Sequence, residues 1–507
     1  MAKKHVNRHV KQKIQARYDA AGTGRRMSGW NTPSSGPNTA ITGLQKIRDR
    51  GRDVVRNEWA GASNARLWKT NIIGTGIVPR PKTTNKALKQ KVTDLWNQWV
   101  PVADADGVLN FYALQSLVVG SWFSSGEVFV RIRPRRMSDG LPVPMQVQVL
   151  EADMCPLLDA DSFPGMPVGN KIRQGIEIDS IGRRVAYWFY TNHPGDRQIA
   201  QNNPQLYTRV PANSVMHVYE PQRPGQLRGV SEMAPVIAKL RNVGDFDDAV
   251  LTRQNLANLF TLFVTKPLPS GNADIMTGMP MEGTLDAPLA GLEPGIAQEL
   301  LPGEDVRFSD PPDAGANYAE FMRTQHLGVA AGIGTPYELS TGDIANVSDR
   351  TLRIVVNEFR RLCEQRQWLI FIPQLCEKVW AAWVDFATLA GALSLNEGVA
   401  AKAVQWAPQG WAYIHPVQDV QAKQLEVEAG FRSRSSVIAE RGNDPDEVDQ
   451  ERKADKDRED ALGLVPEIID PAANPDPAQQ DQADQQQQDQ QQQNAMLERI
   501  LGYMEAS

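Results

Sequence analysis

The clearest pattern of apolar and polar positions lies in residues 305–390, where two helical patterns flank a short polar stretch. The first pattern starts at Asn317 and is ended by two glycines and Pro336. A longer helix is predicted after the polar stretch, with one apolar face formed by Leu352, Val355, Val356, Phe359, Leu362 and Cys363. The polar stretch, residues 340–349, contains no catalytic group. We therefore expect a loop held between two helices, with a mechanical rather than a catalytic role.

In the middle of the chain the apolar pattern changes to the alternation that is typical of β-strands. Two hairpins are predicted, one around the Asp139-Gly140 turn and one around Gly182, and a further strand is predicted at residues 215–219. The alternating positions are Val128, Val130, Ile132, Met145, Val147, Val149, Ile176, Ile178, Val185, Tyr187 and Phe189. Helical patterns occupy residues 41–70, 109–123, 232–263 and 415–440, and residues 264–312 read as a small β-containing insertion. The chain is expected to have an α+β fold.

Both ends of the chain are polar. Residues 1–40 form a basic arm, which is either a solvated tail or an arm that contacts a scaffold protein or DNA. Residues 470–494 are rich in Gln and Asp and nearly free of apolar residues, so they cannot bury enough surface to fold and should be disordered. The amphipathic residues 495–506 at the end either dock on a partner or form a frayed tail.

Composition narrows the class of protein. A chain of 507 residues with 41% hydrophobic content can build a folded body, and no apolar run of about 20 residues is present to span a membrane. The three cysteines have no CxxC spacing, which suits a reducing compartment and argues against a structural zinc site. The net charge of −6 lacks the overall basic character of proteins that grip DNA.

The sequence gives little support for a catalytic site. Asp245, Asp247 and Asp248 lie on a predicted helix, where about 100° per residue points them in three directions, so a solvated or channel-lining acidic face is favoured over a metal site. Gly74-Thr-Gly76 lacks the third glycine of a dinucleotide loop, and no P-loop, HExxH or GxSxG motif occurs. His217, on a predicted strand, is interpreted as a packed or hydrogen-bonded core residue. No enzymatic activity, metal or cofactor is expected.

Several segments, taken in their order and spacing, indicate a family. They are Asn71-Ile-Ile-Gly-Thr-Gly-Ile-Val-Pro-Arg-Pro81, Gly126-Glu-Val-Phe-Val-Arg-Ile-Arg133, Arg173-Gln-Gly-Ile-Glu-Ile-Asp179, Gly182-Arg-Arg-Val-Ala-Tyr-Trp-Phe-Tyr190, Arg223-Pro-Gly-Gln-Leu-Arg-Gly229, Leu301-Pro-Gly-Glu-Asp305 and Gly334-Thr-Pro-Tyr-Glu-Leu-Ser-Thr-Gly342. Over roughly residues 30–430 the chain resembles the portal proteins of lambda-like tailed phages. These are the rings through which DNA enters and leaves the capsid.

The resemblance implies a portal fold with named regions. These are an α/β wing (41–231), a first stem helix (232–260), a small β-containing clip (261–313), a second stem helix (314–334), a tunnel loop (335–349), and a long helix with a helical crown (350–440). Composition adds a basic flexible arm (1–40) and an acidic, Gln-rich disordered tail (441–507), and the tail departs from the family pattern. The tunnel loop would line the DNA channel with Ser340, Thr341, Gly342, Asp343, Ile344, Ala345, Asn346, Val347, Ser348, Asp349 and Arg350.

The resemblance also implies the partners and the place of action. The chain is expected to form a homo-oligomeric ring of twelve subunits at the portal vertex of the virion, after assembly in the host cytoplasm. Double-stranded DNA would pass through the ring. The terminase large subunit would bind the clip first and head-completion or adaptor proteins later, and the ring would contact the major capsid and scaffold proteins. No membrane contact is expected.

Charge suggests how DNA would move. An acidic subunit repeated around a ring repels the DNA backbone, so the duplex slides without being gripped. We therefore expect the tunnel loop to touch DNA through its backbone and small polar groups, namely Ser340, Thr341, Asn346 and Ser348. Two other classes remain open: a phage capsid or tail structural protein without a DNA channel, and a metal-dependent nuclease that uses the acidic cluster.

Overall fold

The computed structural model describes residues 35–38, 43–195, 206–258, 262–265, 305–308, 317–345, 347–411, 416–443 and 445–463. The chain divides into two compact units, one ending at Ile414 and one starting at His415. Most of the predicted basic arm and clip, together with the Gln-rich segment and residues 495–506, lie outside the described residues.

Helices α1 (Leu44–Asn57) and α2 (Trp59–Ile72) open the first unit, where the pattern predicted one helix over 41–70. The break falls at Glu58, which is extended with φ −107° and ψ 124°. A Cβ atom on Gly61 would lie 2.5 Å from the carbonyl oxygen of Val54, so this glycine permits α2 to start close against the last turn of α1.

Two further helices complete the helical part of the expected wing. Helix α4 (Phe111–Ser125) matches its prediction, and its Trp122 lies edge-on against Trp68 of α2, with the ring centroids 5.5 Å apart. Helix α3 (Lys86–Trp99), followed by the short helix η4 (Val100–Val102), was not predicted. Its buried residues do recur at helical spacing: Leu88, Val92, Trp96 and Trp99.

The first predicted hairpin is confirmed. Strand β2 (Glu127–Pro134) pairs antiparallel with β3 (Met145–Glu151), and the short helix η5 (Met137–Asp139) and Gly140 lie at the hairpin tip. The predicted strand β8 (Val215–Tyr219) pairs with the other edge of β2, which gives the order β3-β2-β8. The alternation places Val128, Val130 and Ile132 in the main core, whereas Phe129 faces a second core.

That second core lies under a four-stranded antiparallel sheet of order β4-β5-β6-β7. Its strands are β4 (Lys171–Arg173), β5 (Ile176–Ile178), β6 (Arg184–Tyr190) and β7 (Tyr207–Pro211). The predicted hairpin around Gly182 is confirmed by the β5–β6 pairing, with Ile176 opposite Tyr187. A short helix, η6 (Ala152–Met154), precedes this sheet in the chain. Another, η8 (Ala212–Ser214), links β7 to β8.

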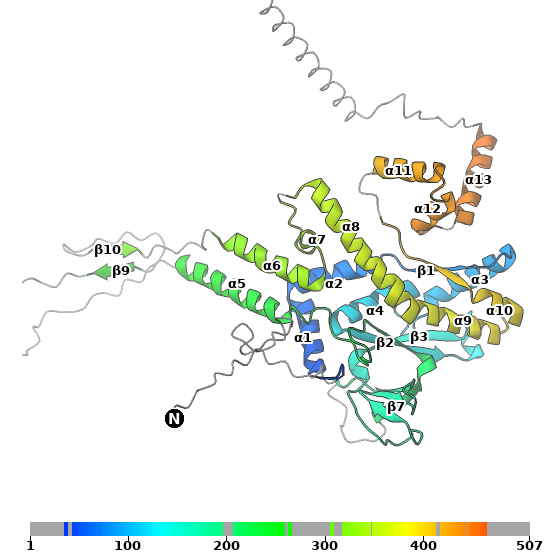
Figure 1. The fold of residues 1–507 in the computed structure, drawn as a ribbon, viewed down its shortest axis with the longest axis horizontal. Coiled ribbons are helices and arrows are strands. Elements are labelled where there is room, and N and C mark those ends of the chain that lie inside the picture. Colours follow the sequence, from blue (N-terminus) through cyan, green and yellow to red (C-terminus); the bar gives the residue numbers. More distant parts are fainter. Residues whose placement is uncertain are drawn as a thin grey trace, which may run out of the picture. The chain divides into compact units, whose positions relative to one another are not determined.

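Helices α5 (Ile237–Asn258) and α6 (Tyr318–Ile333) lie side by side (Figure 1). The Tyr318 hydroxyl donates to the Asp247 carboxylate, and the rings of Phe246 and Phe321 lie 5.0 Å apart. Strands β9 (Leu262–Thr265) and β10 (Asp305–Phe308) come between the two helices in the chain and pair antiparallel. This is the β structure described within the expected clip.

After α6 come the short helix α7 (Tyr337–Thr341) and the predicted long helix α8 (Asp349–Arg366). Helix α8 continues through a π-helical segment, η9 (Gln367–Cys376), into α9 (Glu377–Leu389). Pro373 lies inside η9, where its missing N–H and its ring prevent regular α-helical bonding. Helix α10 (Leu395–Ala401) follows, and β11 (Val404–Ala407) then pairs with β1 (Val78–Pro81).

The second unit contains the predicted helix pair, α11 (Pro416–Glu428) and α12 (Arg434–Glu440). A third helix, α13 (Pro445–Leu462), forms inside the segment 441–507, where we expected a disordered tail. The expectation is wrong for these residues because α13 is rich in good helix formers and carries opposite charges at helical spacing, as in the Arg458–Asp455 pair.

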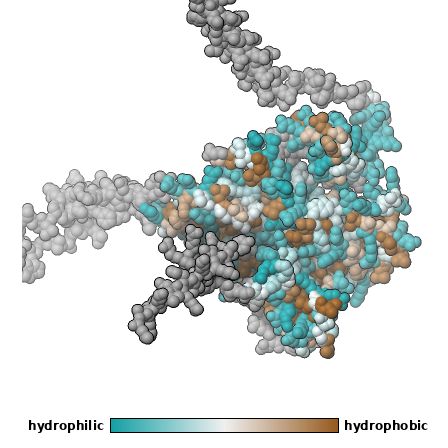
Figure 2. Space-filling view, viewed as in Figure 1, coloured by the Kyte–Doolittle hydropathy of each residue, from teal (hydrophilic) through white to brown (hydrophobic). Residues whose placement is uncertain are grey.

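The surface of the described residues is mixed. Figure 2 shows hydrophobic residues scattered among hydrophilic ones, without one continuous apolar band across the face in view. Among the helices of the described part of the chain, none combines the length and apolar character needed to cross a bilayer.

Candidate functional site

The segment between α6 and α8 is the candidate site, because it contains most of the residues that the resemblance assigns to the DNA channel; the other two, Asp349 and Arg350, form the start of α8. Helix α6 ends at Gly334, whose φ of +79° closes the helix in the left-handed conformation. Helix α7 follows within the expected tunnel loop, and Gly342 ends it with φ +76°. Helix α8 starts at Ser348, whose Oγ accepts from the backbone N–H of Thr351 at 3.2 Å. The expected loop of 335–349 is therefore partly helical.

The predicted channel residues have different surroundings. Ser340 is buried, with only 6% of its surface exposed. Thr341 turns its hydroxyl back to donate to the carbonyl oxygen of Tyr337, 2.8 Å away. Ile344 is 67% exposed, and Gly342, Ala345, Ser348, Asp349 and Arg350 are also exposed. Val347 is half-buried, and Asn346 lies outside the described residues.

Asp343 braces the start of the exposed part of the segment. Its carboxylate accepts from the Tyr337 hydroxyl at 2.9 Å and from the backbone N–H of Ala345 at 3.0 Å. Arg323 of α6 lies 3.6 Å from the same carboxylate and stacks over the Tyr337 ring. The hydrogen bonds from Tyr337 and Ala345, together with the Arg323 charge, lower the pKa of Asp343. This carboxylate is thus ionised at neutral pH and adds negative charge beside the segment.

Arg366, the last residue of α8, joins the C-terminal end of this helix to two glutamates and a tryptophan. Its guanidinium lies 3.5 Å from Glu220 and 3.6 Å from Glu232, and its Cζ atom lies 4.2 Å from the centroid of the Trp68 ring. Burial raises the pKa of Glu232 to about 7, Glu220 acts in the same direction, and Arg366 opposes both. Glu232 lies five residues before the start of α5. The Arg366–Glu232 contact therefore joins the C-terminal end of α8 to the chain just before α5.

An open groove of about 740 Å³ runs along α8 from Ile354 to Gln365, where it faces the α6–α7 turn. Its walls combine the backbone around Gly334 and Pro336 with the apolar side chains of Phe359 and Leu362. No titratable cluster of catalytic type lines it: the charged lining residues are Glu358 and Arg361, which pair with each other at 2.9 Å.

The acidic cluster on α5 does not form a metal site in the described residues. Asp245 pairs with Arg241 of its own helix at 3.0 Å, and Asp247 accepts from Tyr318 of α6. Neither is among the groups whose donor atoms lie close enough together to share an ion. The nuclease interpretation loses its structural support.

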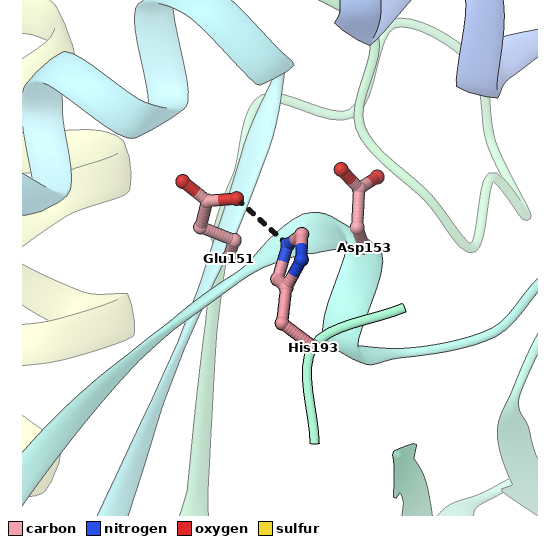
Figure 3. Close-up of side chains that lie close together, drawn as sticks. All are labelled: Glu151, Asp153 and His193. Carbon is pink, nitrogen blue, oxygen red and sulfur yellow. Dashed lines mark hydrogen bonds and ion pairs between the residues drawn. The ribbon is translucent and has the colours of Figure 1, made fainter. Parts of the chain in front are cut away.

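One other group, which the sequence did not single out, does bring possible ligands together. Glu151, Asp153 and His193 place donor atoms within 4.8 Å of one another (Figure 3). Arg52 of α1, however, pairs with both carboxylates, at 3.1 Å from Glu151 and closer still to Asp153. Its guanidinium supplies the positive charge that an ion would bring and would repel one. This cluster is an ion-pair network that joins α1 to the end of β3.

His217 is a hydrogen-bonded core residue, as interpreted from the sequence. Its Nε2 lies 2.8 Å from Glu127, and it is stacked between the rings of Phe129 and Tyr219, with both centroids 4.3 Å away. Burial lowers the pKa of His217 to about 4 despite the nearby carboxylate, so the imidazole is neutral at physiological pH.

The family model described as "Phage portal protein, lambda family" matches residues 23–367 of this chain. The chain belongs to the lambda family of phage portal proteins. The predicted resemblance is thereby confirmed. Similar proteins include the "Probable portal protein" of Halomonas phage phiHAP-1, 26% identical over 480 residues (90% of this chain and 88% of the relative). Portal protein B of Escherichia phage lambda is 22% identical over 494 residues (88% and 90%).

Solved structures with a similar chain come from gene transfer agent (GTA) particles. One is the neck of a native GTA particle computed with C12 symmetry, with a TM-score of 0.43 and 16% identity, covering 83% of this chain and 99% of that chain. Another is the virion of a native GTA, with a TM-score of 0.45 and 15% identity, covering 82% and 96%. The mixed helix-and-strand fold class expected of a lambda-family portal protein is confirmed by the family match.

Sequence reasoning missed the groups that fix the segment in place. Helix α7 was interpreted as loop, although Pro336 and Gly342 bracket a stretch just long enough for one helical turn. Asn64, which bonds to the segment, and Arg366, which joins α8 to Glu220 and Glu232, carry no signal in the sequence because their partners are distant along the chain.

Proposed function

We propose that copies of this portal protein assemble into a ring of twelve at one capsid vertex, and that the lumen of the ring is the channel for genome packaging and ejection. The observation that carries this proposal is the order of elements within one unit. The paired helices α5 and α6 enclose the β9–β10 pair in the chain, and the α7 segment and long α8 follow directly. A stem, clip, tunnel segment and long helix require this order.

The channel contact in this proposal is narrower than the sequence suggested. Ser340 is buried and Ser348 caps α8, so their hydroxyl groups already have partners. The exposed groups that remain for contact with DNA between the two helices are the backbone and side chains around Ile344 and Ala345, with Asn346 outside the described residues. These residues carry no positive charge and the nearby Asp343 is negative, while the exposed Arg350, in the first turn of α8, is the one cation among the predicted channel residues. DNA would slide past Ile344 and Ala345 without phosphate pairing.

The partners follow from the same role. The β9–β10 region would dock the terminase large subunit during packaging and head-completion or adaptor proteins afterwards, and the wing would meet the major capsid and scaffold proteins. The protein itself would act without catalysis, since packaging energy comes from the separate terminase ATPase.

Electron microscopy of the purified protein tests the proposal. End-on views should show a closed ring with a central hole wide enough for a duplex. Particles that stay monomeric under all assembly conditions, or assemblies without a lumen, would favour a capsid or tail structural protein without a channel.

A further inference from the structure

A buried amide on α2 holds both ends of the short segment that contains α7. Asn64 is completely buried, and its Oδ1 accepts from the hydroxyl of Thr335. Its Nδ2 donates to Ser340 Oγ and to the carbonyl oxygen of Ala60, each at 2.8 Å. Next to it, Ser63 Oγ donates to the carbonyl oxygen of Ser340 at 2.7 Å. One side chain thus bonds residues five positions apart, on either side of the first turn of α7.

These bonds are made away from water. Thr335 and Ser340 are 5% and 6% exposed, so breaking either bond would leave a buried polar group without a partner. A network of this kind permits one docking register for α7 on α2, because a shift by one residue would leave both hydroxyl groups unpaired.

The hydrogen bonds from α2 to this segment end at Ser340. Gly342 is in the left-handed conformation, and a Cβ atom there would meet nothing within 4 Å. Beyond it, Ile344 and Ala345 are exposed, and Ser348 fixes the chain again as the cap of α8. Between these two anchors, Asp343 bonds to Tyr337 and Ala345 and pairs with Arg323 of α6, and the backbone N–H of Val347 donates to the carbonyl oxygen of Ile344 at 3.4 Å.

We propose that Asn64 is a positioning residue that fixes the α6–α7 turn and α7 on α2. The part of the expected tunnel loop that can move then starts at Gly342. This inference rests on the proposed function for its biological meaning, though not for its structural test. The movable loop can therefore extend only a short distance from the two helices that hold its ends. The seven residues from Gly342 to Ser348 extend at most about 12 Å from their anchors as a loop, against about 25 Å if all of 335–349 were free.

Hydrogen exchange on the assembled wild-type protein tests the inference directly. The backbone amide of Ser340, which donates to the carbonyl oxygen of Pro336 at 2.9 Å, should exchange at least tenfold more slowly than the amide of Ile344. Replacing Asn64 by Ala should raise exchange of the Ser340 amide about tenfold or more. Ser340→Ala, which leaves α2 intact, should act in the same direction with a smaller effect and covers the case in which Asn64→Ala fails to fold.

Asn71→Ala is the matched control. Asn71 lies on the same helix, and its Nδ2 donates to the carbonyl oxygen of Leu67 at 2.8 Å, as Asn64 does to Ala60. This variant should leave exchange of the Ser340 amide unchanged. If Asn64 served only the core, Asn64→Ala would lower the melting temperature without a local rise in exchange. That result, or fast exchange of the Ser340 amide in the wild type, would overturn the inference.

As part of the proposed function, the exposed residues after α7 would also act as a valve that retains packaged DNA, and DNA retention in filled particles tests that role separately from the anchoring by Asn64. Both Asn64→Ala and deletion of residues 343–347 should lower the fraction of particles that keep their DNA. If Asn64→Ala loosens residues 337–341 while both variants retain DNA normally, the anchoring by Asn64 stands and the retaining role of the segment fails.

Discussion

The carboxylate of Glu127 is buried in the core of the first unit and holds four donors. Arg48 of α1, Arg228 and His217 approach it with their side chains, and the backbone N–H of Gly229 donates at 2.7 Å. Burial alone would raise the pKa of Glu127, but Arg228 and Arg48 outweigh it and keep the pKa well below its usual range. A charge of this kind is tolerated only while every partner is present.

Glu127→Gln should therefore lower the free energy of unfolding by about 3–5 kcal/mol, because two buried guanidinium groups lose their counter-charge. Urea denaturation of the purified subunit measures this loss. Glu151→Gln is the control, since Glu151 is 53% exposed at the side chain and its pair with Arg52 is worth at most about 1 kcal/mol. Equal losses in the two variants would contradict the prediction.

At the scale of elements, α8 links the candidate segment to the root of α5. Its first turn is capped by Ser348, and its last residue, Arg366, contacts Glu220, Glu232 and the Trp68 ring. The π-helical η9 follows at once, so the junction lies where the helix changes its winding. One partner of Arg366 at this junction, Glu232, is a partly buried carboxyl group whose pKa burial raises to about 7.

Glu232 should make stability depend on pH. Its pKa is about 7 in the folded protein against 4.5 for an ordinary glutamate, so between these values the folded state holds a proton that the unfolded state releases. The free energy of unfolding consequently falls as pH rises through this window. Glu232→Gln removes this contribution, and the variant should gain stability relative to wild type from pH 5 to pH 8. Thermal melts at several pH values measure the difference.

The exposed Glu358 on α8 offers the control for this experiment. Its side chain is 67% exposed, and Glu358→Gln should leave the pH dependence of the melting temperature as in wild type. A constant gap between Glu232→Gln and wild type across the pH range would count against the assigned role of Glu232.

At the scale of the whole molecule, the two units differ in their cores. The first contains a continuous apolar core with a tryptophan cluster. In this cluster the ring centroid of Trp96 lies 5.0 Å from that of Trp380 and 5.1 Å from that of Trp383. In the second, none of the described residues from 417 to 463 is buried, and Phe431 is 83% exposed. Helices without a buried face have little tertiary stabilisation of their own.

A fragment of residues 415–507 should accordingly show no cooperative thermal transition by circular dichroism. The complementary chain ending at Ile414 should keep the transition of the first unit, because the described core lies within it. A sigmoidal melt of the isolated C-terminal fragment would show that these helices stabilise one another without further partners.

Local patterns in the sequence determined a large part of this protein. The hairpins of β2–β3 and β5–β6, the strand β8, the helices α4, α6 and α8 and the buried side of Cys363 all follow from periodicity and turn residues, which act between near neighbours. The seven segments between Asn71 and Gly342, in their order and spacing, together also indicate the portal family.

Only the tertiary structure decided what holds the candidate segment. Ser340 looked like a free loop hydroxyl, yet Asn64, 276 residues away, buries and bonds it. The ion pairs of Arg366 with Glu220 and Glu232 likewise join residues that are distant in the chain. Side chains of this kind carry no periodicity, because their energy comes from excluding water at a contact that exists only after the chain has folded.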